Sequence, residues 1–338
     1  MAKMTVVRGS SQYRMYTALG LGVTLLVIAL LPVLLSDFLT FQFTMAFLWA
    51  LGVLSLNMLT GWSGQISLGH SALFGIGAYT TVMLAGSYGW NPLLTVPMAG
   101  LISFLFGFAI GIPALRLAGL YLALMTLAIG VAFVPLIRRF KEYTGGSMGV
   151  SIKSKAFPKE MWGLSRDQYL YYLVVIAGII LFALARNLLK SRVGRAITAM
   201  RDNEIPAQTM GIYPARYKTL IFATSAMFAG LAGSLYGFVI RFAAPYSFTL
   251  TLAITLLAAL VVGGIGTFAG AVIGGIFIQF VPYYAEQVNQ GLAGLVFGVI
   301  IIVIMLAAPL GFMGFVKKWR AKIVNVVDPS VVRSEGAA

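Results

Sequence analysis

The sequence contains no cysteine, one histidine and only nine acidic residues among its 338 positions. The lack of cysteine excludes disulfides and thiolate metal sites. Charged residues make up 10% of the chain and hydrophobic residues 60%, whereas soluble domains contain roughly 25% charged residues. This composition indicates an all-α polytopic membrane protein, because the apolar runs are far longer than the strands of a membrane β-barrel.

Residues that could drive transport or catalysis are also scarce. Ion-driven transporters carry their coupling ion on carboxylates within the membrane, but here His70 is the only titratable residue expected inside a span. No G-x-x-x-x-G-K-[ST] phosphate loop occurs, since the apolar GGIGTFAG at 263–270 lacks the lysine. No zinc-binding spacing or Ser–His–Asp set is present. We therefore expect no enzyme, no catalytic residue and no metal site, and any uphill transport would need an external source of energy.

Apolar blocks predict about ten membrane crossings, within a range of roughly eight to ten because glycine-rich segments can be re-entrant. Residues 1–15 are expected to form an N-terminal tail, 16–310 a transmembrane domain with a polar loop at 187–216, and 311–338 a C-terminal tail. The blocks lie near residues 16–35, 41–60, 62–85, 93–113, 117–137, 168–186, 217–240, 249–264, 267–284 and 291–310.

Basic residues collect in the loops and tails, and this distribution accounts for the net charge of +15 without nucleic-acid binding. A cytoplasmic N-terminus places both the 187–216 loop and the C-terminal tail inside, as the positive-inside rule requires. Residues 138–167 are also basic, yet the same count of crossings places them outside. A missed or extra crossing is the alternative, so the sequence leaves the side of 138–167 open.

Residues 191–212, SRVGRAITAMRDNEIPAQTMGI, form a basic stretch between apolar blocks. Ser191 can cap a helix that continues to Met200, and Asn203 can cap a second one that stops at Gly211. Apolar residues such as Ile197 and Met200 could fill a partner's groove, although a solvated surface loop is the alternative. The predicted docking residues are Arg192, Arg195, Met200, Arg201, Asp202, Glu204, Met210 and Gly211.

A polar, glycine-punctuated segment, SGQISLGHS at 63–71, interrupts an apolar block. Broken helices occur at membrane depth where they line a cavity. The candidates for the substrate path are therefore Ser63, Gln65, Ser67, His70 and Ser71. Hydrogen bonding between helices without substrate contact is the alternative, and His70 is best explained as a structural histidine. The glycines predicted to act in helix packing or bending are Gly64, Gly69, Gly263, Gly264, Gly266 and Gly270.

Several motifs resemble one family. GRAITAMRDNEIPAQTMGI and the following YKTLIFATSAMFAGLAGSLYG are similar to the coupling segment and next span of ABC-type branched-chain amino acid permeases, in particular their M-type membrane subunit. The motifs NMLTGWSGQISLGHSALFGIGAYT, LRLAGLYLALMTLAIG, TGGSMGV and LAALVVGGIGTFAGAVIGG match in order and spacing, so the resemblance covers about residues 45–310. The coupling segment only loosely follows the EAA pattern of the ABC superfamily, which leaves open which residue enters the ATPase groove.

This resemblance implies the permease fold of an ABC importer in a bacterial inner membrane, with both termini in the cytoplasm. It also implies a homologous second permease subunit, two cytoplasmic ABC ATPases and a periplasmic substrate-binding protein as partners, besides membrane lipid. No cofactor is expected on this chain, since the ATPases would use Mg-ATP and push on residues 191–212. Urea, short amides and aromatic acids are alternative solutes. A passive channel for a small neutral solute and a structural membrane scaffold are alternatives of another class.

Overall fold

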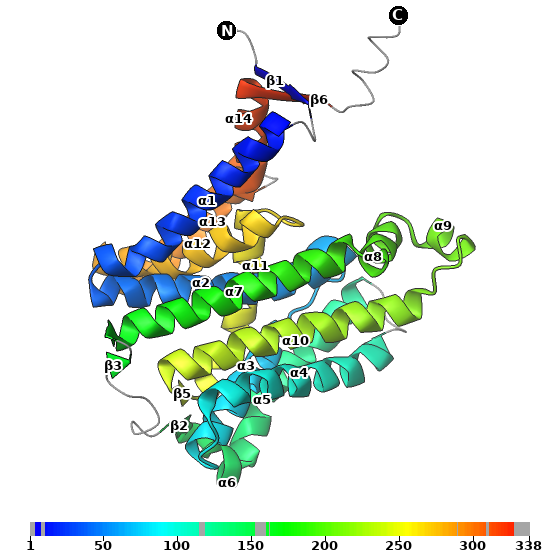
Figure 1. Ribbon diagram of the computed structural model, residues 1–338. Coiled ribbons are helices and arrows are strands. Elements are labelled where there is room, and N and C mark those ends of the chain that lie inside the picture. Colours follow the sequence, from blue (N-terminus) through cyan, green and yellow to red (C-terminus); the bar gives the residue numbers. More distant parts are fainter. Residues whose placement is uncertain are drawn as a thin grey trace, which may run out of the picture.

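The computed structural model describes residues 4–7, 11–114, 119–152, 160–161, 163–288, 290–308 and 311–327. These residues are almost entirely helical, as the composition predicts (Figure 1). The helices are α1 (Ser11–Leu34), α2 (Asp37–Asn57), α3 (His70–Gly86), α4 (Pro92–Ala114), α5 (Leu120–Arg139), α6 (Lys141–Thr144), α7 (Arg166–Lys190), α8 (Arg192–Asp202), α9 (Glu204–Thr209), α10 (Pro214–Ile240), α11 (Leu250–Gly263), α12 (Phe268–Val288), α13 (Ala293–Ala307) and α14 (Gly311–Ile323). The predicted N- and C-terminal tails lie partly outside the described residues.

Short elements connect these helices. One π-helical turn, η1 (Met58–Trp62), extends α2, and the 3-10 turns are η2 (Gly146–Met148), η4 (Pro245–Phe248) and η5 (Gln290–Leu292). The strands are β1 (Met4–Val7), β2 (Val150–Ser151), β3 (Glu160–Met161), β4 (Leu164–Ser165), β5 (Phe242–Ala243) and β6 (Val324–Val327). They form three two-stranded sheets, of which β1–β6 is parallel and β2–β5 and β3–β4 are antiparallel.

The core of the bundle is built around α2 and α10, each buried over 72% of its most apolar stretch. Helix α10 packs against α2, α3 and α4, and α12 packs along α2. Glycines allow the closest of these contacts: a Cβ atom added to Gly77 of α3 would lie 1.9 Å from the carbonyl oxygen of Gly230 in α10. Within lipid, where the hydrophobic effect does not hold helices together, such close backbone packing is a main source of association.

Seven helical stretches among the described residues are long and apolar enough to cross a membrane. The predicted count of about ten crossings is therefore not confirmed, although each predicted apolar block contains a helix. Three of the helices in these blocks are short: α3 has 17 residues, α13 has 15 and α11 has 14. Fourteen residues extend only about 21 Å, less than the roughly 30 Å of a hydrocarbon core. Apolar composition alone does not distinguish such partial helices from full crossings.

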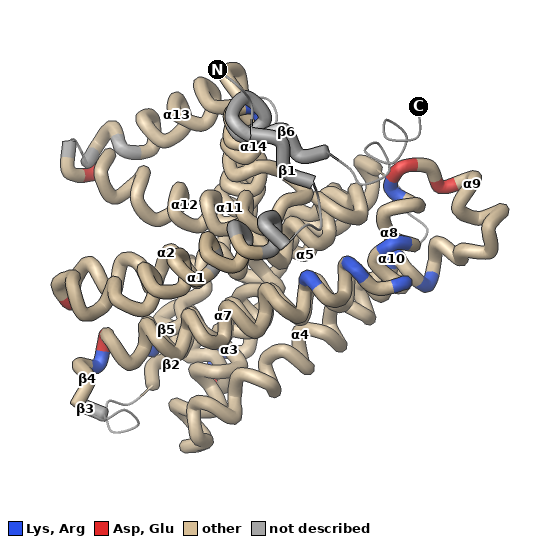
Figure 2. The backbone as a smooth tube through the Cα atoms, turned by 45° about the horizontal axis from the view of Figure 1, so that its top comes forward, with Lys and Arg blue, Asp and Glu red and all other residues tan. Residues whose placement is uncertain are grey.

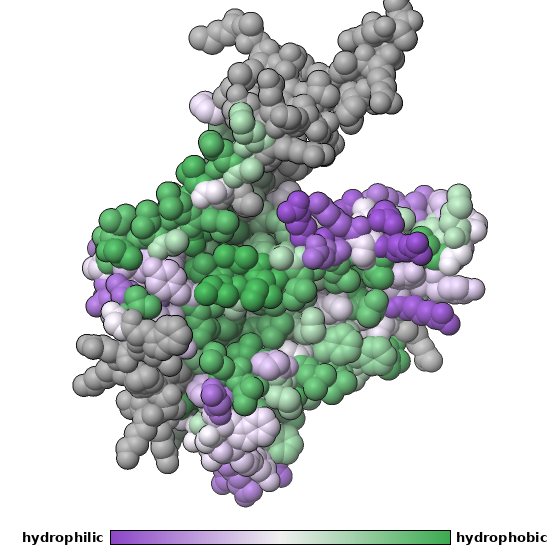
Figure 3. All heavy atoms as spheres, in the orientation of Figure 1, coloured by the Kyte–Doolittle hydropathy of each residue, from purple (hydrophilic) through white to green (hydrophobic). Residues whose placement is uncertain are grey.

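The polar segments gather at two opposite ends of the bundle, with apolar surface between them (Figure 3). Helices α8 and α9 lie at one end, where basic residues cluster (Figure 2). Helix α10 runs for 27 residues, about 40 Å, from that end to β5, which pairs with β2. The described parts of 138–167 thus lie at the end opposite α8 and α9, the relative placement that the count of crossings predicts. Residues 153–159 and Trp162 lie outside the described residues.

Candidate coupling site

Residues 191–212 form the two capped helices that the sequence predicts. The hydroxyl of Ser191 accepts a hydrogen bond from the Gly194 amide at 3.4 Å and begins α8. The side chain of Asn203 accepts one from the Ile205 amide at 3.3 Å and begins α9. Such caps satisfy amides that have no partner inside the helix. Gly211 follows α9 with φ of 80°, a left-handed conformation that glycine adopts without strain.

The two helices present only part of the predicted docking surface to solvent. Arg192 and Arg195 are exposed, and Met210 is 83% exposed at the far end of α9. By contrast, Met200 is 6% exposed and Ile197 is 1% exposed, because both lie on the face of α8 that packs against the membrane helices. Met200 and Ile197 are therefore not available to a partner's groove, contrary to the prediction. The sequence pattern of an amphipathic helix does not show whether its apolar face packs against the same chain or against a partner protein.

Arg201 contacts the membrane helices of its own chain. Its Nη1 atom donates a hydrogen bond to the carbonyl oxygen of Gly61 at 2.9 Å, while Nε and Nη2 donate to the carboxylate of Asp202 at 3.0 and 2.8 Å. The guanidinium thus uses its planar set of donors to join α8 to the end of η1. Arg201 therefore makes intramolecular contacts that a role in docking alone does not require, although both Arg201 and Asp202 remain exposed.

Glu204 forms a second internal link. Its two carboxylate oxygens accept hydrogen bonds from Nζ of Lys218 on α10, at 2.9 and 2.7 Å. Lys218 is only 23% exposed at its side chain, so this pair is better shielded than an ordinary surface ion pair. The pair fixes the start of α9 against the start of α10.

The segment 63–71 is a broken connection between η1 and α3. Gly64 has φ of 72° and reverses the chain, and the hydroxyl of Thr60 donates to the Gln65 carbonyl at 3.1 Å. The chain then returns into the bundle, where the amide of Leu68 donates to the hydroxyl of Thr126 on α5 at 3.0 Å. Gly69 lies so close to α5 that an added Cβ would be 2.6 Å from the Thr126 carbonyl oxygen. Helix α3 therefore begins inside the bundle rather than at its surface.

Both ring nitrogens of the buried His70 have hydrogen-bond partners. Nδ1 lies 2.9 Å from the hydroxyl of Ser67, and Nε2 lies 2.8 Å from the hydroxyl of Ser225 on α10. Because Ser225 donates its proton to the carbonyl of Ser55 on α2 at 2.6 Å, it accepts from the imidazole. A neutral ring with its proton on Nε2 satisfies all of these groups. His70 thus joins α3, α10 and α2, and neither nitrogen is left for a solute.

The other substrate-path candidates divide into two groups. Ser67 and Ser71 are buried, and the Ser71 hydroxyl has no hydrogen-bond partner among the described residues. Ser63 and Gln65 lie at the end of the bundle that carries α8 and α9, where the Gln65 amide donates to the Ser63 hydroxyl at 2.6 Å. The structure therefore does not bring the five candidates together on one surface.

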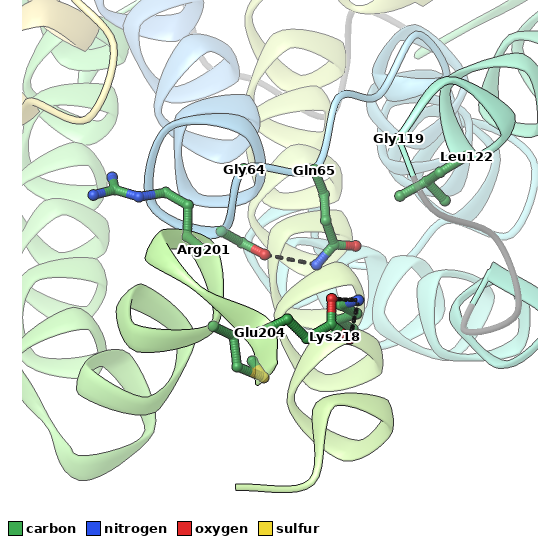
Figure 4. Close-up of a pocket in the computed structure, with 9 residues that line it drawn as sticks. Gly64, Gln65, Gly119, Leu122, Arg201, Glu204 and Lys218 are labelled. Atoms are coloured by element: carbon green, nitrogen blue, oxygen red, sulfur yellow. Dashed lines mark hydrogen bonds and ion pairs between the residues drawn. The ribbon is translucent and has the colours of Figure 1, made fainter. Parts of the chain in front are cut away.

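Ser63 and Gln65 instead line a cavity of about 190 Å³ beneath α8 and α9 (Figure 4). Met200, Glu204 and Lys218 line it from the opposite side. The Arg201 side chain points away from Glu204 and Lys218, toward the end of η1 (Figure 4). The broken segment and the two-helix segment, which the sequence treats as separate features, thus meet at one site.

The glycine-rich stretch 263–270 forms the tight connection between α11 and α12. A Cβ atom on Gly263 would lie 2.0 Å from the Gly270 carbonyl oxygen, and one on Gly270 would lie 2.4 Å from that of Gly264. Gly264 and Gly266 have φ of 117° and 72°, which side chains rarely tolerate. We call residues 264–267 the hairpin tip.

Sequence reasoning missed the residue that holds this tip. Asn57, the last residue of α2, is completely buried. Its Nδ2 atom donates to the carbonyl of Thr267 at 2.8 Å, and its Oδ1 atom accepts from the amide of Gly266 at 2.8 Å. An amide side chain in an apolar block is itself a signal, because it must find partners when it is buried.

No Asp, Glu, Lys or Arg is buried within the described part of the chain, and the buried His70 has both ring nitrogens hydrogen-bonded. Likewise, no group of acidic, histidine or cysteine residues in that part could hold a metal ion. A bundle of apolar helices with a neutral interior and a basic two-helix segment at one end has the features of a membrane permease subunit.

Residues 38–305 match the family described as the permease component of branched-chain amino acid transport systems. The chain is 31% identical to the high-affinity branched-chain amino acid transport permease LivM of Salmonella typhimurium, a match that covers 80% of this chain and 68% of the relative. It is 32% identical to the LivM protein of Escherichia coli K12, over 77% and 66% of the two chains. The LivH permease of the same strain is 25% identical, over 80% and 92%. No solved structure matches the chain.

The chain therefore belongs to the family of branched-chain amino acid transport permease components. It is a multi-span membrane permease of an ABC-type importer, a transport subunit rather than an enzyme. The match to both LivM and LivH proteins is consistent with a paired permease.

Proposed function

We propose that this chain forms one half of the path through which an ATP-driven importer carries branched-chain amino acids. A homologous second permease subunit would complete the path, two cytoplasmic ATPases would dock on α8 and α9, and a periplasmic binding protein would deliver the solute. The observation that carries this proposal is an exposed basic surface on α8, at the end of a bundle without buried charged side chains among the described residues. A bundle with such an interior offers no group for ion coupling, so the driving force must enter through contact with another protein.

The proposal also sets the orientation. The basic end with α8 and α9 would lie in the cytoplasm of a bacterial cell, together with both termini, as the positive-inside rule favours. The end with β2, β5 and η4 would then face the periplasm. The apolar side chains exposed along α4, α5 and α7 would contact lipid or the second permease.

Reconstitution of the complete complex tests this function. Proteoliposomes that contain both permeases, the ATPases and Mg-ATP, with the binding protein outside, should accumulate radiolabelled leucine above its external concentration. Selectivity for leucine over urea and benzoate should be at least about tenfold, a difference of about 1.4 kcal/mol. Omission of ATP provides the control. Equilibration of leucine without ATP would identify a passive channel instead, and preferential uptake of urea or benzoate would contradict the assigned solute class.

A further inference from the structure

Gly61 occupies a junction at the end of α2. In a continuing helix its carbonyl would accept from the amide of Gln65, but that amide donates to the carbonyl of Leu59 at 3.2 Å because the left-handed Gly64 ends the helix. The Gly61 carbonyl accepts from Nη1 of Arg201 instead. The end of η1 therefore presents a backbone acceptor to α8 rather than to its own helix.

The stem of Arg201 fits closely against the same turn. A Cβ atom on Gly64 would lie 2.9 Å from Cγ of Arg201, and Gly64 needs its positive φ to leave the helix. The absence of a side chain at Gly64 thus leaves room for the arginine stem. Arg201 is held at both its aliphatic and its polar part, so a displacement of α8 would act directly on η1.

The hairpin tip lies on the other side of Gly61. A Cβ atom on Gly61 would be 2.6 Å from the amide nitrogen of Gly266, so the two backbones touch. Asn57 bridges them with its two hydrogen bonds to Gly266 and Thr267. The rings of Trp62 and Phe268 pack with their centroids 4.7 Å apart just beyond this contact. The end of α2 and the start of α12 therefore form one packed unit.

We propose that Arg201 and Asn57 are positioning residues that transmit the movement of α8 to the hairpin of α11 and α12, through the π-helical turn at Gly61. This inference rests on the proposed docking of an ATPase on α8 and α9. Arg201 connects the docking segment to η1, and Asn57 connects η1 to the hairpin tip. A displacement of α8 would thus reach α11 and α12, which are distant from α8 in the sequence, through the end of α2. The contacts along this route are contiguous, of the kind that carries energetic coupling between sites.

The variant Arg201→Met tests the first link, because it keeps an apolar stem and removes the guanidinium. Arg216→Met is the matched control, since Arg216 is an exposed cation at the start of α10. In the complete complex, Arg201→Met should retain ATPase binding and ATP hydrolysis within about twofold, but should transport at least about fivefold less leucine per ATP hydrolysed. Arg216→Met should leave that ratio unchanged. A normal ratio in Arg201→Met would overturn the proposal. Loss of ATPase binding in that variant would also overturn it, by assigning Arg201 to docking alone.

Asn57→Leu tests the second link, with Asn57→Gln as the variant that keeps the amide. Asn57→Leu should lower the amount of leucine transported per ATP hydrolysed, and Asn57→Gln should lower it less. A normal ratio in Asn57→Leu would contradict a transmitting role. Because burial makes Asn57→Leu prone to misfolding, a distance measurement provides an independent test.

The distance measurement uses the lack of cysteine in this chain. Spin labels on cysteines introduced at Met210 and Ile265, both exposed, would report the separation between α9 and the hairpin tip. The separation should stay constant through the ATP cycle in the parent protein and change in Arg201→Met. A separation that changes equally in both proteins would show that the tip does not follow α8. Failure of the parent complex to bind ATPases or accumulate leucine would instead refute the proposed function itself.

Discussion

Replacement of both Arg192 and Arg195 by glutamate is expected to lower ATP-dependent leucine uptake at least about tenfold. Both side chains are exposed on α8, and the change turns an attractive surface into a repulsive one for an acidic groove. Arg195 makes a hydrogen bond to the Lys190 carbonyl at 3.0 Å, but this bond is solvent-exposed, so its loss should cost little stability. Uptake in membrane vesicles and retention of the ATPases during purification measure the effect.

The matched control reverses two basic residues at the other end of the bundle. Arg139 and Lys141 are exposed near α6, and Arg139→Glu with Lys141→Glu should leave ATPase retention unchanged. Full uptake and retention in the Arg192 and Arg195 variant would exclude docking on α8. Equal loss of ATPase retention in both double variants would show a general effect of charge rather than a docking site.

Replacement of Gly77 or Gly233 by valine is expected to prevent stable folding. An added Cβ atom at Gly77 would lie 1.9 Å from the Gly230 carbonyl oxygen, and one at Gly233 would lie 1.8 Å from that of Phe74. Both contacts join α3 to α10 through the backbone, which cannot move aside as a flexible side chain can. Overpacking of a core typically costs about 1–3 kcal/mol, and more where the backbone is rigid.

Gly298→Val supplies the control for this prediction, because no atom beyond the nearby backbone of its own helix lies within 4 Å of the Cβ position at Gly298 on α13. The yield of monodisperse protein in detergent and its thermal unfolding midpoint should fall sharply for the Gly77 and Gly233 variants, and should remain unchanged for Gly298→Val. Normal yield and midpoint for Gly77→Val would mean that α3 and α10 are not packed as described.

The sequence predicts where the helices lie along the chain better than how far each helix extends across the membrane. Apolar blocks locate each long helix, and the hydroxyl of Ser191 and the amide of Asn203 identify the starts of α8 and α9, because capping is a local interaction. The short length of α11, by contrast, is not explained by local interactions. The end of this 14-residue helix meets a hairpin tip that Asn57 holds from α2, more than two hundred positions away in the chain.

The candidate site was predictable in part for the same reason. The basic pattern of 191–212 indicates a docking segment, but it does not show that Met200 and Arg201 face the chain's own helices while Met210 faces solvent. Likewise, the polar residues of 63–71 indicate a broken helix. Only the tertiary structure shows that Ser225 is the hydrogen-bond partner of His70 Nε2. It alone also shows that Gln65 lines the same cavity as the Glu204–Lys218 pair.

Cross-linking at α9 is the most direct test of the central claim that this permease receives its driving force through α8 and α9. The chain contains no cysteine, so a cysteine introduced at Met210 carries the only thiol of this subunit. In the complete complex, a short thiol-reactive cross-linker at Met210→Cys should capture the ATPase, and the same cross-linker at Tyr246→Cys, at the opposite end, should not. Capture of the ATPase from Tyr246→Cys, or none from Met210→Cys in a complex that still transports leucine, would contradict the account.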